Sequence, residues 1–461
     1  MFKLASVLAG VALLSGAASA QVSDTILAQA EAMRDAAIKG SPAYDILESL
    51  TTEIGPRLAG TPEEAMARQW AVAKLQELGF DDVRVEPFML PTWVRGEESG
   101  AILSPFPQPL YLTALGNSGA TGPDGMSGEL VMFETLDDLR AAPDGSLDGK
   151  IAYIGHAMRK TQDGSHYGAF GDARRSGPQV AAEKGAKAII IRSIGTDSHR
   201  FPHTGGTRFA KNTTPIPAAA VSNPDADQLE RIAKRGKPIE ISLTLTPRQI
   251  GEQESGNVIA DIKGSKYPDE IIIMGGHLDS WDLGTGAVDD GSGVAITTAA
   301  QKMILDSGLR PERTIRLVMW GSEEVGLIGA RAYAKAHAGE IDKHMLGSES
   351  DFGADVIYQL VHDVSDDGKV IVEQMAKLLA PIGVATRTGG GSSGPDLIPL
   401  NQMGLPTFRL AQDGTDYFDL HHTPDDTLDK VNPHKMDQNV AAYLVFLWLA
   451  ANTDVEFRKA G

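Results

Sequence analysis

GGHLDSWDLGTGAVDDGSG, residues 275–293, comes directly after a short apolar run, residues 271–274, that is typical of a buried strand. Two glycines end the strand, and helix-forming sequence resumes at Val294. The glycine-rich loop between them offers four side chains that can bind a cation, namely His277, Asp279, Asp289 and Asp290. A histidine and several carboxylates crowded at the carboxyl end of a buried strand indicate a metal site.

Strand-like and helix-like segments alternate on both sides of this loop. Strands are expected at 257–262, 270–274, 314–320, 356–361 and 407–410, and helices at 294–305, 327–337, 370–379 and 436–452. This alternation predicts an α/β fold whose core is a mostly parallel, doubly wound sheet with helices on both faces. Ligands of such sheets bind outside the carboxyl ends of the strands, which is where the loop lies.

The first half of the chain changes texture at about residue 121. Before it, residues 24–55 and 62–78 favour helices, the second with Thr61 as its cap and Glu64 completing a capping box. A strand is expected at 82–88 until Pro91 breaks the pattern, and an edge strand or loop at 103–115. From 121 to about 247, short strand-like runs between glycine-rich turns predict an inserted α/β or β-rich domain with its own core.

A chain of 461 residues is expected to form two or three domains. The predicted limits are a signal peptide over 1–20, the amino-terminal part of the main domain over 21–120, the inserted domain over 121–248, and the carboxy-terminal part with the metal site over 249–461. Lys3, the apolar run 4–14 and the small residues 18–20 indicate secretory cleavage near Ala20–Gln21, with an ordinary first helix as the alternative. The product is then expected to be a soluble periplasmic or secreted protein.

Composition excludes several classes of function. The net charge of −19 argues against nucleic acid and anionic membrane surfaces as partners. The apolar run 441–451 is too short to span a bilayer. Because the chain has no cysteine, disulfides, thiolate nucleophiles and cysteine metal sites are all excluded.

Further candidate ligands follow or precede other strands. Glu323 and Glu324 come directly after the strand 314–320, Asp351 lies in a loop before the strand 356–361, and His422 lies in YFDLHHTPDDT. Each has an ordinary interpretation, since a histidine at a strand end is usually structural and paired glutamates usually form a solvated turn. The shared sheet edge weakens that interpretation, because adjacent carboxylates near a core repel each other unless a cation lies between them.

Nitrogen and oxygen ligands without sulfur suit zinc in a catalytic site with open positions. The predicted set is His277, Asp289, Glu324, Asp351 and His422. Five groups are too many for one catalytic zinc but suit two metal ions about 3.5–4 Å apart that share one carboxylate. Asp289 is the expected bridge. Asp279 is expected to orient His277 from outside the ligand set, and Asp426 to orient His422.

Four segments together resemble the M28 family of co-catalytic zinc exopeptidases, especially the branch of carboxypeptidase Q and its bacterial relatives. They are GGHLDSWDLGTGAVDDGSG, VMWGSEEVGLIGA (318–330), ESDFGAD (349–355) and YFDLHHTPDDT (417–427), in the family's order. GPQVAAEKGAKAIIIRS followed by IPAAAVS, within 177–222, resembles a protease-associated domain, and residues 54–96 resemble the amino-terminal part of the same branch. The resemblance covers nearly all of the chain after residue 20.

The resemblance implies a role for each residue of the site. One metal would be held by His277, Asp289 and Asp351, and the other by Asp289, Glu324 and His422. Glu323 falls on the general-base position, and Asp279 on that of the carboxylate behind the ligands. The peptide bond after the bridging Asp289 is usually cis in this family, which leaves Asp290 as a turn residue. His421 stands where many members have a tyrosine near the metal, and is expected to donate to the developing oxyanion, the alternative being that it merely packs.

The expected activity is hydrolysis of a peptide bond next to a free terminus, with two zinc ions per chain, a metal-bridging water as nucleophile and Glu323 as base. Small peptides, particularly dipeptides, are the expected substrates, and a homodimer is a possible assembly. The loop 389–394 can present N–H groups to a substrate terminus or be a flexible turn. His199, Arg200 and His203 can fold over the cleft or remain on the surface. Alternative functions are an aminopeptidase acting on longer peptides, a receptor-like protein without metal, and a single-zinc glutaminyl cyclase.

Overall fold

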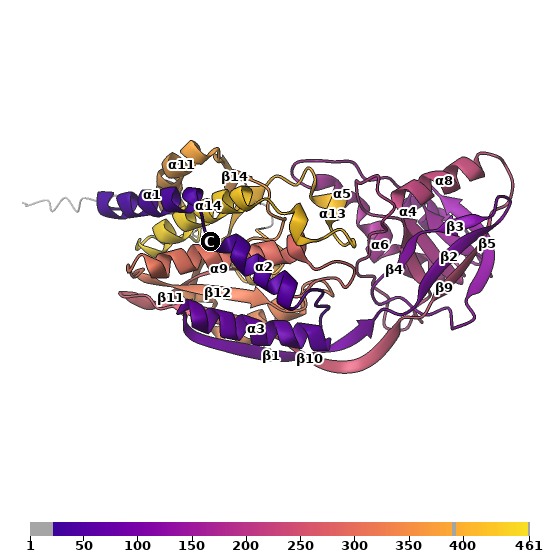
Figure 1. Cartoon of the computed structure of the whole chain (residues 1–461), viewed down its shortest axis with the longest axis horizontal. Coiled ribbons are helices and arrows are strands. Elements are labelled where there is room, and N and C mark those ends of the chain that lie inside the picture. Colours follow the sequence, from indigo (N-terminus) through magenta and orange to yellow (C-terminus); the bar gives the residue numbers. More distant parts are fainter. Residues whose placement is uncertain (1–21, 390–392, 460–461) are drawn as a thin grey trace, which may run out of the picture.

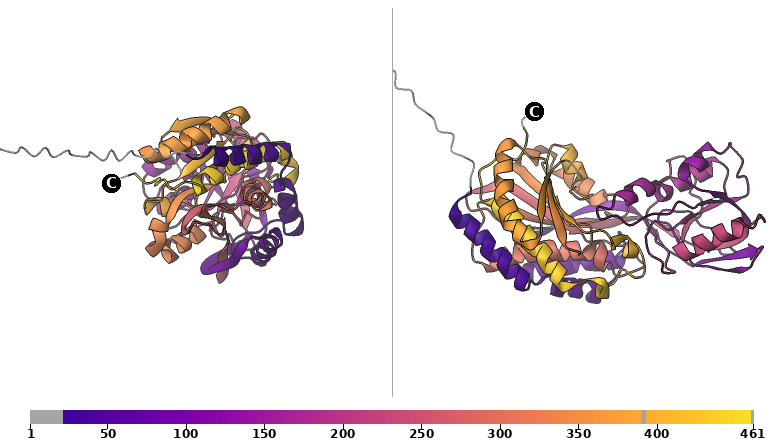
Figure 2. Two further views of the ribbon diagram at one scale, coloured as in Figure 1. Left: turned by 90° about the vertical axis from the view of Figure 1, so that its left-hand side faces the viewer. Right: turned by 90° about the horizontal axis from the view of Figure 1, so that it is seen from above.

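The computed structural model describes residues 22–389 and 393–459. The signal peptide predicted over residues 1–20 therefore lies outside the described residues. Two lobes follow each other along the long axis, a larger one with helices around a sheet and a smaller one built on a second sheet (Figures 1 and 2). Both ends of the described chain lie in the larger lobe.

The sheet of the larger lobe has five strands in the order β1-β10-β12-β11-β13. Their bounds are β1 Asp81–Val94, β10 Arg248–Ile262, β11 Tyr267–His277, β12 Arg313–Trp320 and β13 His344–Glu349. A bridge between Gly347 and Thr407 connects this sheet to a second one of order β15-β14-β16. Its strands are β14 Ile357–His362, β15 Ala385–Thr388 and β16 Phe408–Gln412. The predicted α/β class is confirmed.

The strand pairing is mixed rather than mostly parallel. β11 pairs in parallel with β12 and β13, whereas β10 is antiparallel to both β1 and β12. The parallel strands lie side by side, so the carboxyl ends of β11, β12 and β13 meet at one edge. β13 is missing from the prediction because HMLGSE carries only two large apolar residues, a weak pattern for a strand.

Helices cover both faces of the larger sheet. α9 Ser292–Asp306 and α14 Pro433–Ala451 pack on one face, and against them lie α1 Asp24–Lys39, α2 Ala43–Glu53 and α11 Asp366–Leu379. α10 Ile328–Ala336 and α12 Ile398–Gln402 share a separate core with the other face. Every residue of α14 from Met436 onward is buried, which accounts for its apolar composition on all sides. Within the described ranges, no helix is long and apolar enough to cross a membrane.

The helix α3 Pro62–Leu78 begins and ends where the sequence predicts. Thr61 caps it by accepting the N–H of Glu64 at 3.4 Å, and Gly79 follows with a φ of +88°. The other half of the predicted capping box is wrong. The Glu64 carboxylate turns away from the cap, accepts a hydrogen bond from Ser255 Oγ at 3.1 Å and lies 2.9 Å from Arg68. A buried polar contact therefore ties α3 to β10.

β1 and β10 continue beyond the larger sheet as a long antiparallel ribbon that leads into the smaller lobe (Figure 1). The strand predicted at 82–88 therefore runs on to Val94, and the break expected at Pro91 is wrong. Pro91 lacks an N–H, but β1 is the edge strand of its sheet, where one side of the strand needs no partner.

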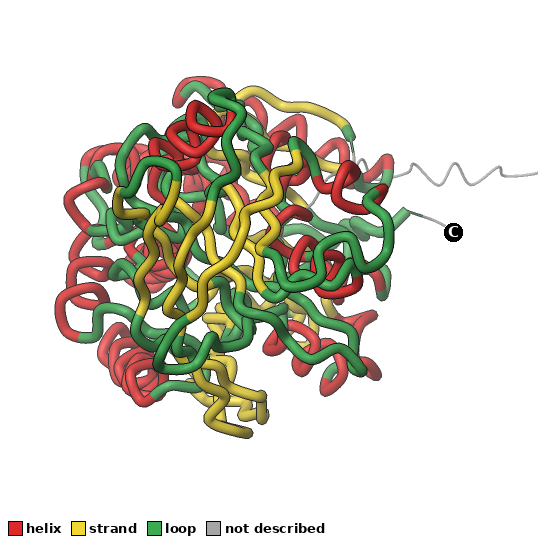
Figure 3. The backbone as a smooth tube through the Cα atoms, turned by 90° about the vertical axis from the view of Figure 1, so that its right-hand side faces the viewer, coloured by secondary structure: helices red, strands yellow, loops and turns green. Residues whose placement is uncertain are grey.

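The strands of the smaller lobe face the viewer in Figure 3. They form an eight-stranded sheet in the order β3-β2-β9-β5-β6-β7-β8-β4. The strands are β2 Glu98–Ser104, β3 Gln108–Leu110, β4 Leu112–Ala114, β5 Met126–Phe133, β6 Ile151–Ile154, β7 Ala188–Arg192, β8 Ala218–Val221 and β9 Glu240–Leu245. The helices are α4 Leu136–Ala141, α5 Ser165–Phe170, α6 Asp172–Arg175, α7 Gly177–Glu183 and α8 Asn223–Ala233. This sheet begins at Glu98, earlier than the limit expected at residue 121, because β2 pairs with β9 and β4 with β8.

Candidate metal centre

Several predicted site residues lie where three neighbouring strands end. His277 is the last residue of β11 and pairs with Trp320, the last residue of β12. Glu323 and Glu324 follow β12 directly, and Asp351 follows β13 rather than merely preceding β14. Because the three strands end at the same edge of the sheet, these side chains converge there.

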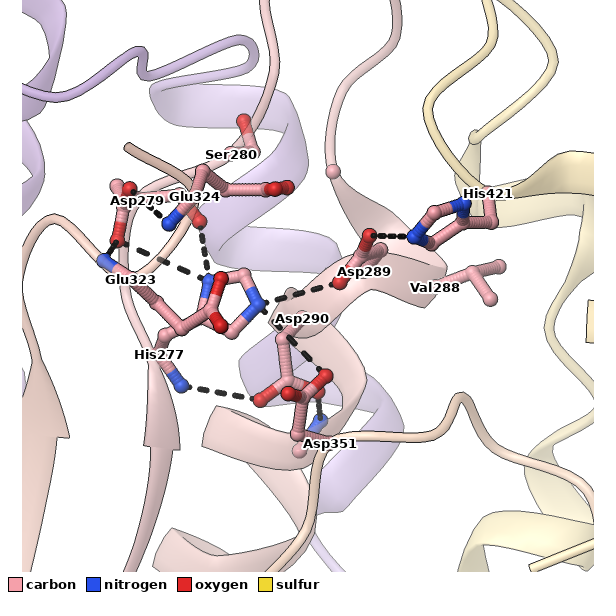
Figure 4. A network of polar contacts seen from close by, with 12 residues as sticks. His277, Asp279, Ser280, Val288, Asp289, Asp290, Glu323, Glu324, Asp351 and His421 are labelled. Carbon is pink, nitrogen blue, oxygen red and sulfur yellow. Dashed lines mark hydrogen bonds and ion pairs between the residues drawn. The ribbon is translucent and has the colours of Figure 1, made fainter. Parts of the chain in front are cut away.

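Asp289 lies between two histidines and faces each of them with a different oxygen. Its Oδ1 is 3.1 Å from Nε2 of His277 (Figure 4), and its Oδ2 is 3.2 Å from Nε2 of His422. Nε2 of His277 is also 3.7 Å from Oδ1 of Asp351, and Nε2 of His422 is 3.0 Å from Oε2 of Glu324. The five predicted ligands therefore form two triads that share Asp289, which we call the His277 triad and the His422 triad.

The donor set of the two triads fits a cation. Their side chains are at most 8% exposed, and Oε1 of Glu324 is buried without a hydrogen-bond partner among the described residues. Burial raises the pKa of Asp351 to about 7 and that of neighbouring Glu323 well above its usual range. Desolvated carboxylates side by side are unfavourable without a neutralising charge. Imidazole and carboxylate ligands without sulfur are those of a catalytic zinc site.

The Asp279 carboxylate holds the two glutamates rather than the ring of His277. Its oxygens accept the main-chain N–H groups of Glu323 at 3.0 Å and of Glu324 at 3.3 Å (Figure 4). Nδ1 of His277 instead donates to the main-chain carbonyl of Asp279 at 2.9 Å, and the carboxylate is 3.8 Å away. Asp279 therefore orients His277 through its main-chain carbonyl and not through its carboxylate.

Asp426 and Asp290 hold the main chain of the loop 275–293, which we call the metal loop. Asp426 accepts the N–H groups of Val288 at 2.6 Å and Asp289 at 3.2 Å, so the prediction that it orients His422 is wrong. Asp290 follows a cis peptide bond, as expected from the resemblance. Its carboxylate is fully buried and accepts the N–H of His277 at 3.0 Å and of Gly293 at 3.1 Å, so it is more than a turn residue.

Arg57 supports the same loop, although it belongs to no motif of the sequence. The side chain is fully buried and donates to the carbonyls of Leu278, Thr285 (2.6 Å) and Gly286 (2.8 Å). A single arginine within the mostly apolar segment 54–59 is the only signal that the sequence offers. Its cation lies below a loop that carries several buried carboxylates, which favours their ionised forms.

His421 stacks on His422, with ring centroids 3.5 Å apart, and its Nε2 is 3.5 Å from Oδ2 of Asp289 (Figure 4). Burial and the neighbouring His422 lower the pKa of His421 well below its usual range. A neutral ring with a single N–H therefore lies beside the shared carboxylate.

A cavity of about 480 Å³ opens over the two triads and lies between the lobes. The larger lobe contributes Glu323, His421, Arg409 and the triad residues other than His277, and the smaller lobe contributes Asn117, Tyr167, Arg174, Arg175, Thr207 and Arg208. Ser393 and Gly394 of the predicted loop 389–394 also line it, while residues 390–392 lie outside the described residues.

His199, Arg200 and His203, for which folding over the cleft and a surface position were the two alternatives, do not line this cavity. Arg200 pairs with Asp225 within the smaller lobe, and His199 is exposed. His203 is buried, with Nε2 2.7 Å from Asp197. The smaller lobe therefore reaches the cavity through other residues, mainly those around Arg174 and Arg208.

Comparisons with known proteins identify the family of the chain. Residues 257–447 match peptidase family M28. Carboxypeptidase Q of Bos taurus is 35% identical over 413 residues, which cover 89% of this chain and 86% of that protein. The structure of a peptidase M28 precursor from Shewanella amazonensis SB2B has a TM-score of 0.92 at 52% identity, covering 94% of this chain and 98% of that one. BSAP, a zinc aminopeptidase from Bacillus subtilis, shares the fold with a TM-score of 0.61 at 22% identity, covering 89% and 94%.

The chain therefore belongs to peptidase family M28. It is a metallopeptidase, so the receptor-like alternative is set aside. Its relatives include both a carboxypeptidase and an aminopeptidase by name.

Proposed function

We propose that this peptidase is a secreted two-zinc exopeptidase that hydrolyses dipeptides or other short peptides. The observation that carries the proposal is Asp289, which turns one carboxylate oxygen toward His277 and the other toward His422. One zinc ion would be held by the His277 triad and the other by the His422 triad. When bound, zinc supplies an acidified water nucleophile and polarises the substrate carbonyl.

Glu323 is the proposed general base. Asp279 fixes the main chain of Glu323, and the Glu323 carboxylate lines the cavity. The carboxylate takes a proton from the attacking water and passes it to the amine nitrogen that leaves. His421, as a neutral donor beside Asp289, is proposed to donate its N–H to the developing oxyanion.

The size and charge of the cavity support short peptides with a free carboxylate. A volume of about 480 Å³ lies within the usual range for small-molecule sites. Arg208 of the smaller lobe and Arg409 of β16 both line it, and neither forms an ion pair within the described ranges. Guanidinium groups bind carboxylates through charge-assisted hydrogen bonds. We therefore assign recognition of the substrate carboxylate to these two arginines.

A panel of peptides tests the substrate class. Rates are compared for dipeptides, their longer homologues, and dipeptides with an acetylated amino terminus or an amidated carboxyl terminus. The proposal expects dipeptides to be the best substrates and amidation to slow their hydrolysis. Equal cleavage of long peptides from the amino terminus would instead identify an aminopeptidase acting on longer peptides.

The variant Glu323→Ala tests the chemistry. We expect kcat to fall by about 10²–10⁴-fold, because a positioned general base contributes that much. Zinc content, measured by mass spectrometry on the purified protein, should remain at two ions per chain, since Glu323 lies outside both triads. Retained turnover would remove Glu323 from the mechanism.

Export and assembly need separate measurements. Sequencing the amino terminus of the protein from the periplasm or medium should find Gln21 as the first residue. Light scattering of the purified protein tests the homodimer that the resemblance suggests.

A further inference from the structure

The smaller lobe reaches the His422 triad through main-chain contacts. Thr204 meets His422 twice, since its N–H donates to the carbonyl of His422 at 3.0 Å and its own carbonyl accepts from Nδ1 of His422 at 3.1 Å. The N–H of Thr196 donates to the carbonyl of Phe418 at 3.0 Å, in the helix α13 Tyr417–Leu420 that precedes the two histidines. The lobes are therefore joined along a segment, not at one point.

Arg174 of helix α6 holds the Thr204 carbonyl from the other side. Its guanidinium donates to that carbonyl at 3.2 Å and also to the hydroxyl of Tyr167. The side chain is 4% exposed and packs so closely under Gly205 that a Cβ there would lie 2.4 Å from the guanidinium. Among the described residues it forms no ion pair with a carboxylate, so its hydrogen bonds serve to fix the main chain at Thr204.

These contacts set the orientation of the His422 ring. The Thr204 carbonyl is 3.1 Å from Nδ1, and the Arg174 guanidinium is 3.2 Å from the same nitrogen, so the smaller lobe encloses Nδ1. Nε2 faces the opposite way, 3.2 Å from Asp289 and 3.0 Å from Glu324. Nε2 is therefore the nitrogen that can bind a cation held by these two carboxylates.

The smaller lobe also holds His422 in an unfavourable backbone conformation. His422 has a φ of +63°, in the left-handed region that residues with a Cβ rarely adopt. The carbonyls before and after it are both bound by the smaller lobe, that of His421 by Nδ1 of His203 at 2.7 Å and that of His422 by Thr204. His203 is itself fixed by its contact with buried Asp197.

We infer that Arg174 is a positioning residue for the metal centre. By holding the Thr204 carbonyl, it fixes the orientation of the His422 ring, which makes the smaller lobe part of the metal site at the His422 triad. The inference rests on the proposed function, because it takes His422 as a zinc ligand. Contacts of this kind, one step behind a metal ligand, typically change metal affinity by about 10–100-fold.

Zinc titration of Arg174→Met tests this inference. The apoprotein is titrated with zinc against a competing chelator, and with cobalt while its visible spectrum is followed. The His277 triad should bind its ion as in the wild type, whereas the ion of the His422 triad should bind about 10–100-fold more weakly. Arg174→Lys, which keeps one donor, should give an intermediate loss. Arg200→Met is the matched control, since it removes an arginine of the same lobe that pairs only within that lobe.

Unchanged affinity for both ions in Arg174→Met would overturn the inference. If this variant does not fold, Tyr167→Phe removes one partner of the guanidinium without burying a new charge. A several-fold loss of affinity for the second zinc is then expected, and an unchanged affinity again overturns the inference. Failure of the proposed function gives a different result, because the wild-type protein would then bind fewer than two zinc ions or hydrolyse no peptide.

Discussion

His421 and His422 are adjacent in sequence and stacked in space, yet their surroundings suit them to different chemistry. His422 donates Nδ1–H to Thr204 and turns Nε2 to two carboxylates, as a metal ligand does. The Nδ1 of His421 is buried and without a hydrogen-bond partner among the described residues. Burial lowers the pKa of His421, so its imidazole is neutral and carries a single N–H. A substrate oxyanion is a suitable acceptor for that N–H.

His421→Phe separates that role from simple packing. The variant keeps a flat ring against His422 and removes the N–H. We expect kcat to fall by about 10²–10³-fold, the usual cost of one oxyanion donor, with zinc content and KM nearly unchanged. Normal turnover with intact metal content would mean that His421 merely packs.

Arg208 and Arg409 are the residues proposed to bind the carboxylate of the substrate. Arg409 is half-buried with its guanidinium 5.6 Å from the ring centroid of Phe352, and Arg208 is exposed. Replacing either with glutamine should raise KM for a free dipeptide by about tenfold or more, because a charge-assisted hydrogen bond contributes about 1.5–3 kcal/mol. KM for the dipeptide amide should change little.

The exposed Arg331 of α10 lies outside the cavity, so Arg331→Gln is the control for a general change of charge. Equal rises in KM for the dipeptide and its amide in Arg208→Gln and Arg409→Gln would exclude recognition of the carboxylate by these arginines.

The sequence identifies site residues well where a motif contains them. It does so poorly where the role of a residue depends on which of its atoms makes the contact. Asp279 and Asp426 are predicted near the site from their spacing, but spacing cannot show whether a carbonyl or a carboxylate meets a histidine. Arg57 and Arg174 lie in no motif, and both act on main-chain carbonyls far away in sequence. Such contacts exist only after the chain has folded.

Elements are predicted where their side-chain pattern is strong. α9, α14 and β12 have the expected type within a few residues, because long apolar periods define them. β13 has too few apolar residues to be recognised, and Pro91 hides the continuation of β1. In both cases the strand is specified by its neighbours in the sheet rather than by its own propensity.

Glu64 on α3 makes the stability of this element depend on pH. Burial raises the pKa of Glu64 from 4.5 to about 7, although Arg68 lies close by. The native state therefore holds a proton that the unfolded state has lost between these two values, so the stability contributed by this group falls as pH rises from 4.5 to 7. The difference amounts to about 3 kcal/mol.

Glu64→Gln removes the titrating group and with it this pH dependence of the stability. Between pH 4.5 and pH 8 the wild type should lose about 3 kcal/mol of unfolding free energy through Glu64, and the variant should not. The stability of the variant minus that of the wild type should therefore be about 3 kcal/mol larger at pH 8 than at pH 4.5. Denaturant unfolding of both proteins at the two pH values measures this double difference, in which the other titrating groups cancel. A difference that does not change with pH would show that Glu64 stays ionised across the range.

The two lobes meet around the metal centre. Arg95, just after the ribbon strand β1, binds Asp282 of the metal loop through two contacts of 2.7 and 2.8 Å. Trp93 packs edge-on against Trp281 with ring centroids 6.5 Å apart. Together with the Thr204–His422 pair, these contacts place the metal loop between the lobes, so metal binding and lobe docking are expected to favour each other.

Removal of the metal ions should therefore lower the stability of the protein and weaken the docking of its lobes, in addition to stopping catalysis. An ion that binds the native state alone stabilises it by about 4 kcal/mol when present at 1,000 times its dissociation constant. We expect a chelator to lower the thermal midpoint by several degrees, added zinc to restore it, and limited proteolysis near the ribbon to be faster in the chelated protein. In Arg174→Met the shift should be smaller, because one ion already binds weakly. A chelated protein with the midpoint and the cleavage rate of the zinc form would mean that the lobes dock independently of the metal centre.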